Sequence, residues 1–280
     1  MSPVAVRLLW TSRTSRITFL LLLMSLVVLP CARAQTFTPT GNLNIARAGQ
    51  QATLLLDGRV LASGGYDNSI NAIARAEIFD PSTGAWTVTG TNVVARFEHT
   101  ATLLQDGRVL VVGGGSSNSS CSSNATAETY NPVTSTWSLT ANLPAPAGAG
   151  ATAVRLIDGR VLVSGGGNRC GGFFSTAALF DPVTNTWSAT ANMTTTRAFH
   201  SAALLSDGRV LVAGGVPASN TWSASAEVYD PITGAWTAVG SMLTARGAAD
   251  NYVQTFLATL QSGGVLARMR ALFARLFGAS

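Results

Sequence analysis

The sequence predicts an all-β propeller with four recognisable blades, each built from four antiparallel strands. One phrase recurs four times at intervals of about 50 residues, and every copy carries its turn residues at matching positions. Gly, Ser, Thr and Val are abundant, while charged residues make up only 11% of the chain. This composition favours short strands and tight turns over helices.

The repeated phrase is Asp-Gly-Arg-Val-Leu. Each copy runs into a pair of glycines, then into a Phe or Tyr followed by an Asp-Pro or Asn-Pro turn, and finally into a Trp. The phrases span residues 57–61, 106–110, 158–162 and 207–211; the glycine pairs are 64–65, 113–114, 165–166 and 214–215; the aromatic and its turn are 79–81, 130–132, 180–182 and 229–231; and the closing residues are Trp86, Trp137, Trp187 and Trp236.

Each unit predicts four strands in order. An apolar run such as 202–205 leads into Asp-Gly, which predicts a type I′ hairpin because Gly accepts a positive φ. The second strand is continuously apolar, as in 109–112, which indicates burial on both faces between neighbouring sheets. The glycine pair ends this strand where backbones approach closely. The third strand carries the aromatic residue, Pro presets the next turn, and the fourth strand begins at the Trp.

The period, the glycine doublet, the spaced Phe or Tyr and the final Trp resemble the kelch repeat family over residues 36–246. The resemblance implies radially arranged four-stranded blades and usually a binding role. The repeats also resemble the propeller of the galactose oxidase family. Phe37 lies as far before Arg47 as Trp86 lies before Arg96, so residues 36–44 are expected to form a lone fourth strand.

The first 34 residues have the pattern of a signal peptide. Arg7, Arg13 and Arg16 precede an apolar run over 17–29, and Ala32-Arg33-Ala34 is a small-x-small cleavage site before Gln35. A transmembrane anchor is the alternative, but the run is shorter than the roughly 20 residues that span a bilayer. We therefore expect a propeller over 35–246 that is secreted, periplasmic or at the cell surface, with no transmembrane anchor after cleavage.

Charge and cysteine content say little about partners. Four of the 18 basic residues and none of the 13 acidic ones lie in this leader, so the mature chain is nearly neutral. Nucleic-acid binding would need a basic face with stacking aromatics, and the sequence shows neither. Cys121 and Cys170 lie in equivalent loops of neighbouring units and are predicted to form one disulfide in an oxidising compartment.

The tail over 247–280 leaves the repeat pattern. Residues 258–260 and 263–266 faintly echo a first strand and an Asp-Gly-Arg turn, and 268–277 has the spacing of a short amphipathic helix. Two interpretations stay open. The tail is either a degenerate fifth blade with a helix, or the end of an incomplete relative of a longer propeller.

Residues with catalytic chemistry are explained by the repeat. His99 and His200 occupy the same place in two units, where the other two hold Gln50 and Ala151. The recurring Arg and Glu are interpreted as structural partners; they are Arg47, Arg96, Arg197 and Arg246, and Glu77, Glu128 and Glu227. We therefore expect no catalytic residue, no metal site and no cofactor.

The units differ most in the loops between their second and third strands. Because strands alternate in direction, these loops share the face opposite the near-identical Asp-Gly and Asp-Pro turns, and variable loops on a constant scaffold favour a binding role. The expected contacts are Tyr66, Asp67, Asn68, Asn168, Arg169, Asn220 and Trp222. The sequence thus favours a non-catalytic scaffold for a protein or glycan ligand. The alternative is a truncated or accessory propeller of a secreted galactose oxidase-like or carbohydrate-active enzyme.

Overall fold

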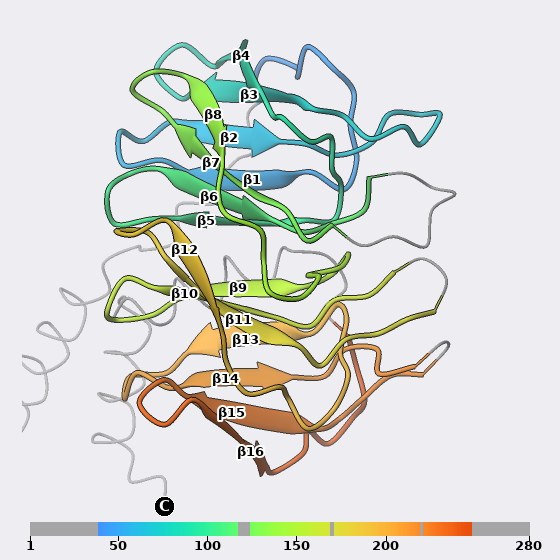
Figure 1. Ribbon diagram of the computed structural model, residues 1–280. Coiled ribbons are helices and arrows are strands. Elements are labelled where there is room, and N and C mark those ends of the chain that lie inside the picture. Colours follow the sequence, from blue (N-terminus) through green and yellow to red (C-terminus); the bar gives the residue numbers. More distant parts are fainter. Residues whose placement is uncertain (1–38, 117–123, 169–170, 219–220, 248–280) are drawn as a thin grey trace, which may run out of the picture. The chain divides into compact units, whose positions relative to one another are not determined.

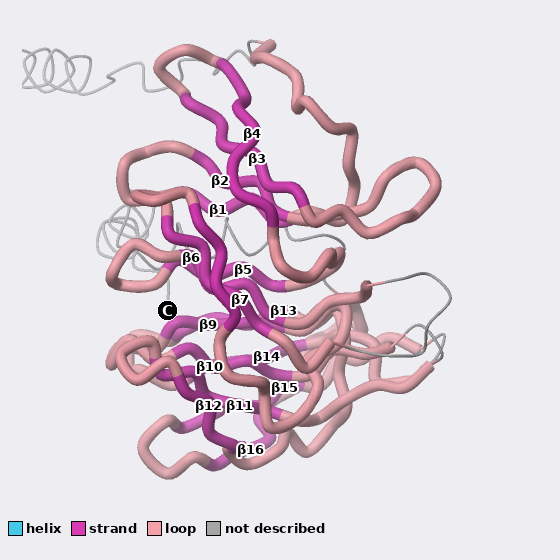
Figure 2. Tube along the Cα trace, turned by 45° about the horizontal axis from the view of Figure 1, so that its top comes forward, coloured by secondary structure: helices cyan, strands magenta, loops and turns pink. Residues whose placement is uncertain are grey.

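The computed structural model describes residues 39–116, 124–168, 171–218 and 221–247. Its contacts divide the chain between Thr40 and Gly41, and the structure below belongs to the second unit. Every regular secondary-structure element in the described residues is a β-strand (Figures 1 and 2). They are β1 Gln51–Leu54, β2 Val60–Ser63, β3 Arg75–Asp80, β4 Ala85–Thr91, β5 Thr100–Leu103, β6 Val109–Val112, β7 Ala127–Asn131, β8 Thr136–Leu139, β9 Thr152–Arg155, β10 Val161–Ser164, β11 Ala177–Asp181, β12 Thr186–Ala189, β13 Ser201–Leu204, β14 Val210–Ala213, β15 Ala226–Asp230 and β16 Ala235–Val239.

These strands form four antiparallel sheets, each made from four strands that are consecutive in the chain. The sheets are the four predicted blades, numbered here in chain order. In every blade the aromatic residue of the third strand pairs with the Trp of the fourth, as Tyr229 pairs with Trp236. The two rings lie 5.0–5.2 Å apart between centroids in all four blades. The all-β prediction is confirmed.

The hydrophobic core lies between successive blades. Leu61 and Ile78 of blade 1 pack with Val109 and Tyr130 of blade 2, and equivalent clusters join blade 2 to blade 3 and blade 3 to blade 4. The second strands β6 and β10 are buried at every position, as their continuous apolar sequence predicts. Each blade therefore depends on its neighbour for burial.

The Asp-Gly turns are of a different type from the one predicted. A type I′ turn needs positive φ at both central residues, but in the first turn only Gly58 has one, of 87°. The Gly58 N–H donates to the carbonyl of Leu55 (3.1 Å), and the Leu55 N–H donates to the carbonyl of Arg59 (2.8 Å). This is a three-residue hairpin loop in which a left-handed Gly follows a type I turn. The type I′ prediction was wrong because the loop has one residue more.

The segment before β1 resembles the connections that lead into the later blades. Residues 36–38 lie outside the described residues, and 39–44 form no strand, so that part of the lone-strand prediction is wrong. The Gly41 N–H nevertheless donates to the carbonyl of Gly84 (2.9 Å). The N–H groups of Asn44 and Ile45 donate to the Glu77 carboxylate. The N–H groups of residues 93 and 94 donate to the Glu128 carboxylate in the same way. Residues 41–47 therefore reach blade 1 along the route that 90–96 take to blade 2.

The two ends of the blades carry different connections. The turns β1–β2 and β3–β4, with their counterparts in blades 2–4, lie at one end, on the left in Figure 1. The loops between second and third strands and the connections between blades lie at the other end, on the right, which we call the variable face. Within the described ranges, no helix is long and apolar enough to cross a membrane.

Candidate functional site

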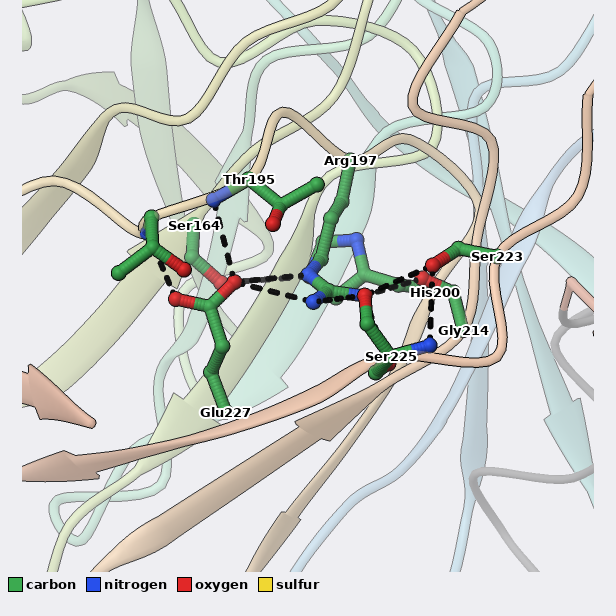
Figure 3. Close-up of polar contacts among 9 residues, drawn as sticks. Ser164, Thr195, Arg197, His200, Gly214, Ser223, Ser225 and Glu227 are labelled. Atoms are coloured by element: carbon green, nitrogen blue, oxygen red, sulfur yellow. Dashed lines mark hydrogen bonds and ion pairs between the residues drawn. The ribbon is translucent and has the colours of Figure 1, made fainter. Parts of the chain in front are cut away.

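A buried ion pair holds the connection into each of blades 1, 2 and 4. In blade 4, Arg197 Nη2 lies 3.0 Å from Glu227 Oε1, and Arg197 also donates to the carbonyls of Gly214 and Ser225 (Figure 3). The N–H groups of 194 and 195 donate to the same carboxylate. Burial raises the pKa of Glu227, but these hydrogen bonds and Arg197 outweigh it and hold the pKa below its usual range. The pairs Arg96–Glu128 and Arg47–Glu77 repeat the arrangement at 2.7 and 2.6 Å.

Blade 3 lacks both partners of this pair. Gly148 stands in the place of the Arg and Ala178 in the place of the Glu, and a small apolar cavity lined by Leu143, Pro146, Val163 and Ala178 lies there. Both charges are absent together, which agrees with the cost of burying either one alone. Three of the four recurring arginines are structural, as predicted, because their guanidiniums are buried and donate to the backbone of their own blades. The fourth, Arg246, is exposed.

Both histidines form hydrogen bonds between blades. His99 Nε2 lies 3.1 Å from Ser63 Oγ of blade 1, and His200 Nε2 lies 2.9 Å from Thr152 Oγ1 of blade 3. Burial, and secondarily the charge of the nearby Arg197, lower the pKa of His200 to about 3. Burial and Arg96 do the same to the pKa of His99. The two imidazoles are neutral at ordinary pH, and each links two blades.

Replacing His200 by Gln is expected to make stability less dependent on pH. The unfolded imidazole binds a proton below pH about 6.5 and the folded one only near 3, so unfolding takes up a proton and stability falls as the pH drops across that interval. Gln, which blade 1 uses at the equivalent position, removes up to about 1.4 kcal/mol per pH unit of this loss. Urea unfolding at pH 7, 6, 5 and 4 measures it. An unchanged slope would mean that folded His200 carries a charge.

The predicted contacts on the variable face have distinct roles. Asp67 accepts hydrogen bonds from the N–H groups of Ser69 and Asn71, both 2.9 Å, and Asn168 accepts one from Gly172 (2.8 Å). These bonds fold the two loops, and those to Asn71 hold the pKa of Asp67 below its usual range. Asn68 is exposed.

The aromatic members of the predicted set are partly covered. The ring of Tyr66 is half-buried and meets the ring of Phe97 edge to face, with centroids 5.5 Å apart. Trp222 lies against Gly247, yet 58% of its surface is exposed. Arg169, Asn220, Cys121 and Cys170 lie outside the described residues, so the disulfide stays a prediction.

Sequence reasoning missed a chain of backbone contacts at the centre of the variable face. Each first strand contacts the first strand of the next blade. Two residues before these strands stand Gly49, Glu98, Gly150 and Phe199, which we call the collar. The N–H groups of Glu98, Gly150 and Phe199 each donate to the carbonyl of the collar residue one blade earlier, at 2.9, 3.1 and 2.8 Å. Their shared place before Gln50, His99, Ala151 and His200 was the available signal.

Family comparisons agree with this geometry. A model of the KLHDC2/KLHL20/DRC7 kelch-repeats domain matches residues 24–215, and a model of the kelch motif matches residues 197–243. The chain belongs to this kelch-repeat family. No curated protein matches it significantly. A solved structure titled "Structure of YjhT" is similar to this kelch domain with a TM-score of 0.61, at 16% identity over 72% of this chain and 73% of that one, which shows a shared fold.

Proposed function

We propose that this kelch-repeat propeller is an exported, non-catalytic scaffold that binds a protein or glycan through its variable face. The contrast between the two faces carries the proposal. On the turn face all four Asp-Gly-Arg loops have the same internal Asp–Arg pair, 2.7 Å between Arg Nη2 and the carboxylate. On the variable face each loop has its own residues, and Trp222 projects into solvent. Constant scaffold and varied loops are the usual division in binding proteins.

The hydrogen bonds of the titratable residues support a non-catalytic role over the galactose oxidase-like alternative. Both histidines are buried and hydrogen-bonded to hydroxyl groups. Tyr130 and Tyr229 lie in the core, where their rings pack against Trp137 and Trp236. Among the described residues no three His, Cys, Asp or Glu side chains gather as metal ligands would. Metal analysis and an oxidase assay on the purified protein discriminate between the two functions.

Export is the second part of the proposal, and the leader supports it. Cleavage before Gln35 would deliver the propeller to the secreted, periplasmic or surface compartment that binding of an external ligand requires. Sequencing the N-terminus of the mature protein tests this step. An intact leader on cytoplasmic protein would contradict it.

Replacing Trp222 by Ala is expected to weaken ligand binding at least about tenfold, because exposed Trp side chains commonly supply more than about 1.4 kcal/mol at an interface. The melting temperature should change little, since more than half of the side chain is already in solvent. Titration of the partner recovered from a glycan array or pull-down measures the affinity. Val183→Ala is the matched control, because Val183 is 90% exposed on the turn face. Equal effects of the two variants would contradict recognition by the variable face.

A further inference from the structure

The connection that follows β16 folds as the connection from blade 3 into blade 4 does. The Met242 N–H donates to a carbonyl of its own blade (2.8 Å), as the Met193 N–H does in blade 3 (2.8 Å). The Arg246 carbonyl accepts the N–H of the second glycine of its doublet (2.9 Å), as the Arg197 carbonyl does (2.7 Å). The main chain that leaves blade 4 is therefore placed as it is where it binds the carboxylate of a following blade.

This connection carries the donors of a carboxylate site. In the three complete sites, one Glu carboxylate accepts from two consecutive main-chain N–H groups and from the Arg guanidinium (Figure 3). After blade 4 the same donors belong to Leu243, Thr244 and Arg246, all of which are exposed. Among the described residues, no acid pairs with Arg246, and none accepts from the N–H groups of 243 and 244. Two adjacent N–H groups and a guanidinium suit a carboxylate.

The side of blade 4 beside these donors is apolar and only partly covered. Leu205, Leu211 and Met242 are half-buried there. A Cβ on Gly214, which directly follows β14, would meet both the Arg246 carbonyl and Met242 Cε (3.1 Å), so the apolar side chains and the donors are adjacent. We call Leu205, Leu211, Met242 and Arg246 the open side of blade 4.

The same positions in blade 3 are covered by the next blade. Leu156, Leu162 and Met193 are each at most 3% exposed and form one core cluster with Tyr229 of blade 4. Tyr229 lies two residues after Glu227 on β15, so the ring and the carboxylate share one face of that strand. The open side therefore matches a strand that presents an acid and, two residues later, an aromatic ring.

This chain does not supply that acid. Its three recurring glutamates are each paired with an arginine of their own chain, and residues 41–47 already lie on the side of blade 1 that a second copy would present. In the complete sites the Glu follows the Arg by 30–32 residues. Residues 276–278 stand at that distance after Arg246 and are Leu, Phe and Gly. Charge complementarity thus favours a partner other than this chain.

We propose that the open side of blade 4 binds a β-hairpin of another polypeptide, one that presents a carboxylate and an aromatic ring on the same face. The carboxylate accepts from the Arg246 guanidinium and from the N–H groups of Leu243 and Thr244, and the ring packs on Leu211 and Met242. This surface is distinct from the variable loops, so the inference goes beyond the proposed function and gives the chain a second binding surface.

The probe is a cyclic peptide with the sequence of residues 224–237, which contains Glu227 and Tyr229 and whose closure preforms the hairpin. Two further peptides are controls. One carries Glu227→Gln, which removes the charge and keeps the shape. The other has the sequence of residues 175–188, the matching hairpin of blade 3, in which Ala178 stands at the Glu position.

Two variants of the full chain complete the design. Arg246→Ala removes the guanidinium at an exposed position, so the melting temperature should stay unchanged. Arg209→Ala is the control, because its half-exposed guanidinium lies on the turn face of the same blade. Calorimetry measures the affinity for each peptide, and amide hydrogen exchange measures the protection of the N–H groups of Leu243 and Thr244.

We expect the Glu peptide to bind the wild type and to slow exchange of both N–H groups. Both control peptides, and the Arg246→Ala variant, should bind at least about tenfold more weakly, while Arg209→Ala binds as the wild type does. No binding at about 1 mM peptide, or equal affinity for the Glu and Gln peptides, overturns the inference. Slow exchange of the two N–H groups before peptide is added, or a dimer that Arg246→Ala dissociates, means that this chain covers the surface itself and also overturns it.

Discussion

Glu227→Ala is expected to destabilise the protein by about 3–5 kcal/mol, because it leaves the buried Arg197 guanidinium without a counter-charge. Both side chains are almost completely buried, at 0% and 1% exposure. The N–H groups of Thr194 and Thr195 also lose their acceptor, which adds to the cost. Urea unfolding monitored by tryptophan fluorescence gives the free energy of unfolding of the variant and the wild type.

Removing both partners should cost less than the two single substitutions suggest. The double variant Arg197→Ala, Glu227→Ala leaves no unpaired buried charge, as in blade 3, where Gly148 and Ala178 stand together. We expect a coupling free energy of at least about 1 kcal/mol in the double-mutant cycle. Simple additivity, or a loss below about 1 kcal/mol for Glu227→Ala alone, would mean that the pair contributes little to folding.

Gly114→Ala is expected to cost more than about 3 kcal/mol and to reduce the yield of folded protein. A Cβ on Gly114 would lie 2.5 Å from the Phe97 carbonyl oxygen and 3.0 Å from His99 Cα, and φ is +83°. Backbone on the neighbouring connection cannot move away without breaking the hydrogen bonds between Phe97 and Gly115 (2.9 and 3.0 Å). Steric overlap and left-handed strain therefore add.

Two other glycines separate these contributions. Gly84 has φ of +68° with nothing near its Cβ position, so Gly84→Ala should show only the strain, about 1–2 kcal/mol. Gly240 has open space and an ordinary φ, so Gly240→Ala should be nearly neutral. Thermal and urea unfolding rank the three variants. A Gly114→Ala variant as stable as Gly84→Ala would show that the backbone around residue 97 yields easily.

The repeat made the architecture readable from sequence, because every unit must bury the same faces against its neighbours. The position of Trp236 opposite Tyr229, the buried run 109–112 and the structural Arg–Glu pairs all follow from that requirement. The turn at Asp57-Gly58 was misjudged because a dipeptide does not specify how many residues close a hairpin, and the hydrogen bond from Leu55 to Arg59 decides it.

The variable face was only partly predictable, because loop roles depend on contacts between blades. Asp67 and Asn168 were predicted as ligand contacts, but the structure shows that they also fold their own loops. The sequence did not reveal Glu98 and Phe199 as collar residues, because nothing in their local sequence indicates a positive φ. That conformation comes from the hydrogen bonds to Gly49 and Gly150 one blade earlier.

The collar also constrains how this protein can change during evolution. Its hydrogen bonds use main-chain atoms alone, so a new side chain there does not uncouple the blades. A larger residue at Gly150, however, would overlap the Phe199 ring that covers it, and one at Gly49 would overlap Tyr66. Substitutions at collar positions 150 and 199 are therefore epistatic: a side chain at 150 requires both the loss of the Phe199 ring and a shift of the main-chain nitrogen of residue 199, which lies 2.8 Å from the Cβ position. Homologues should exchange collar residues in such ordered pairs.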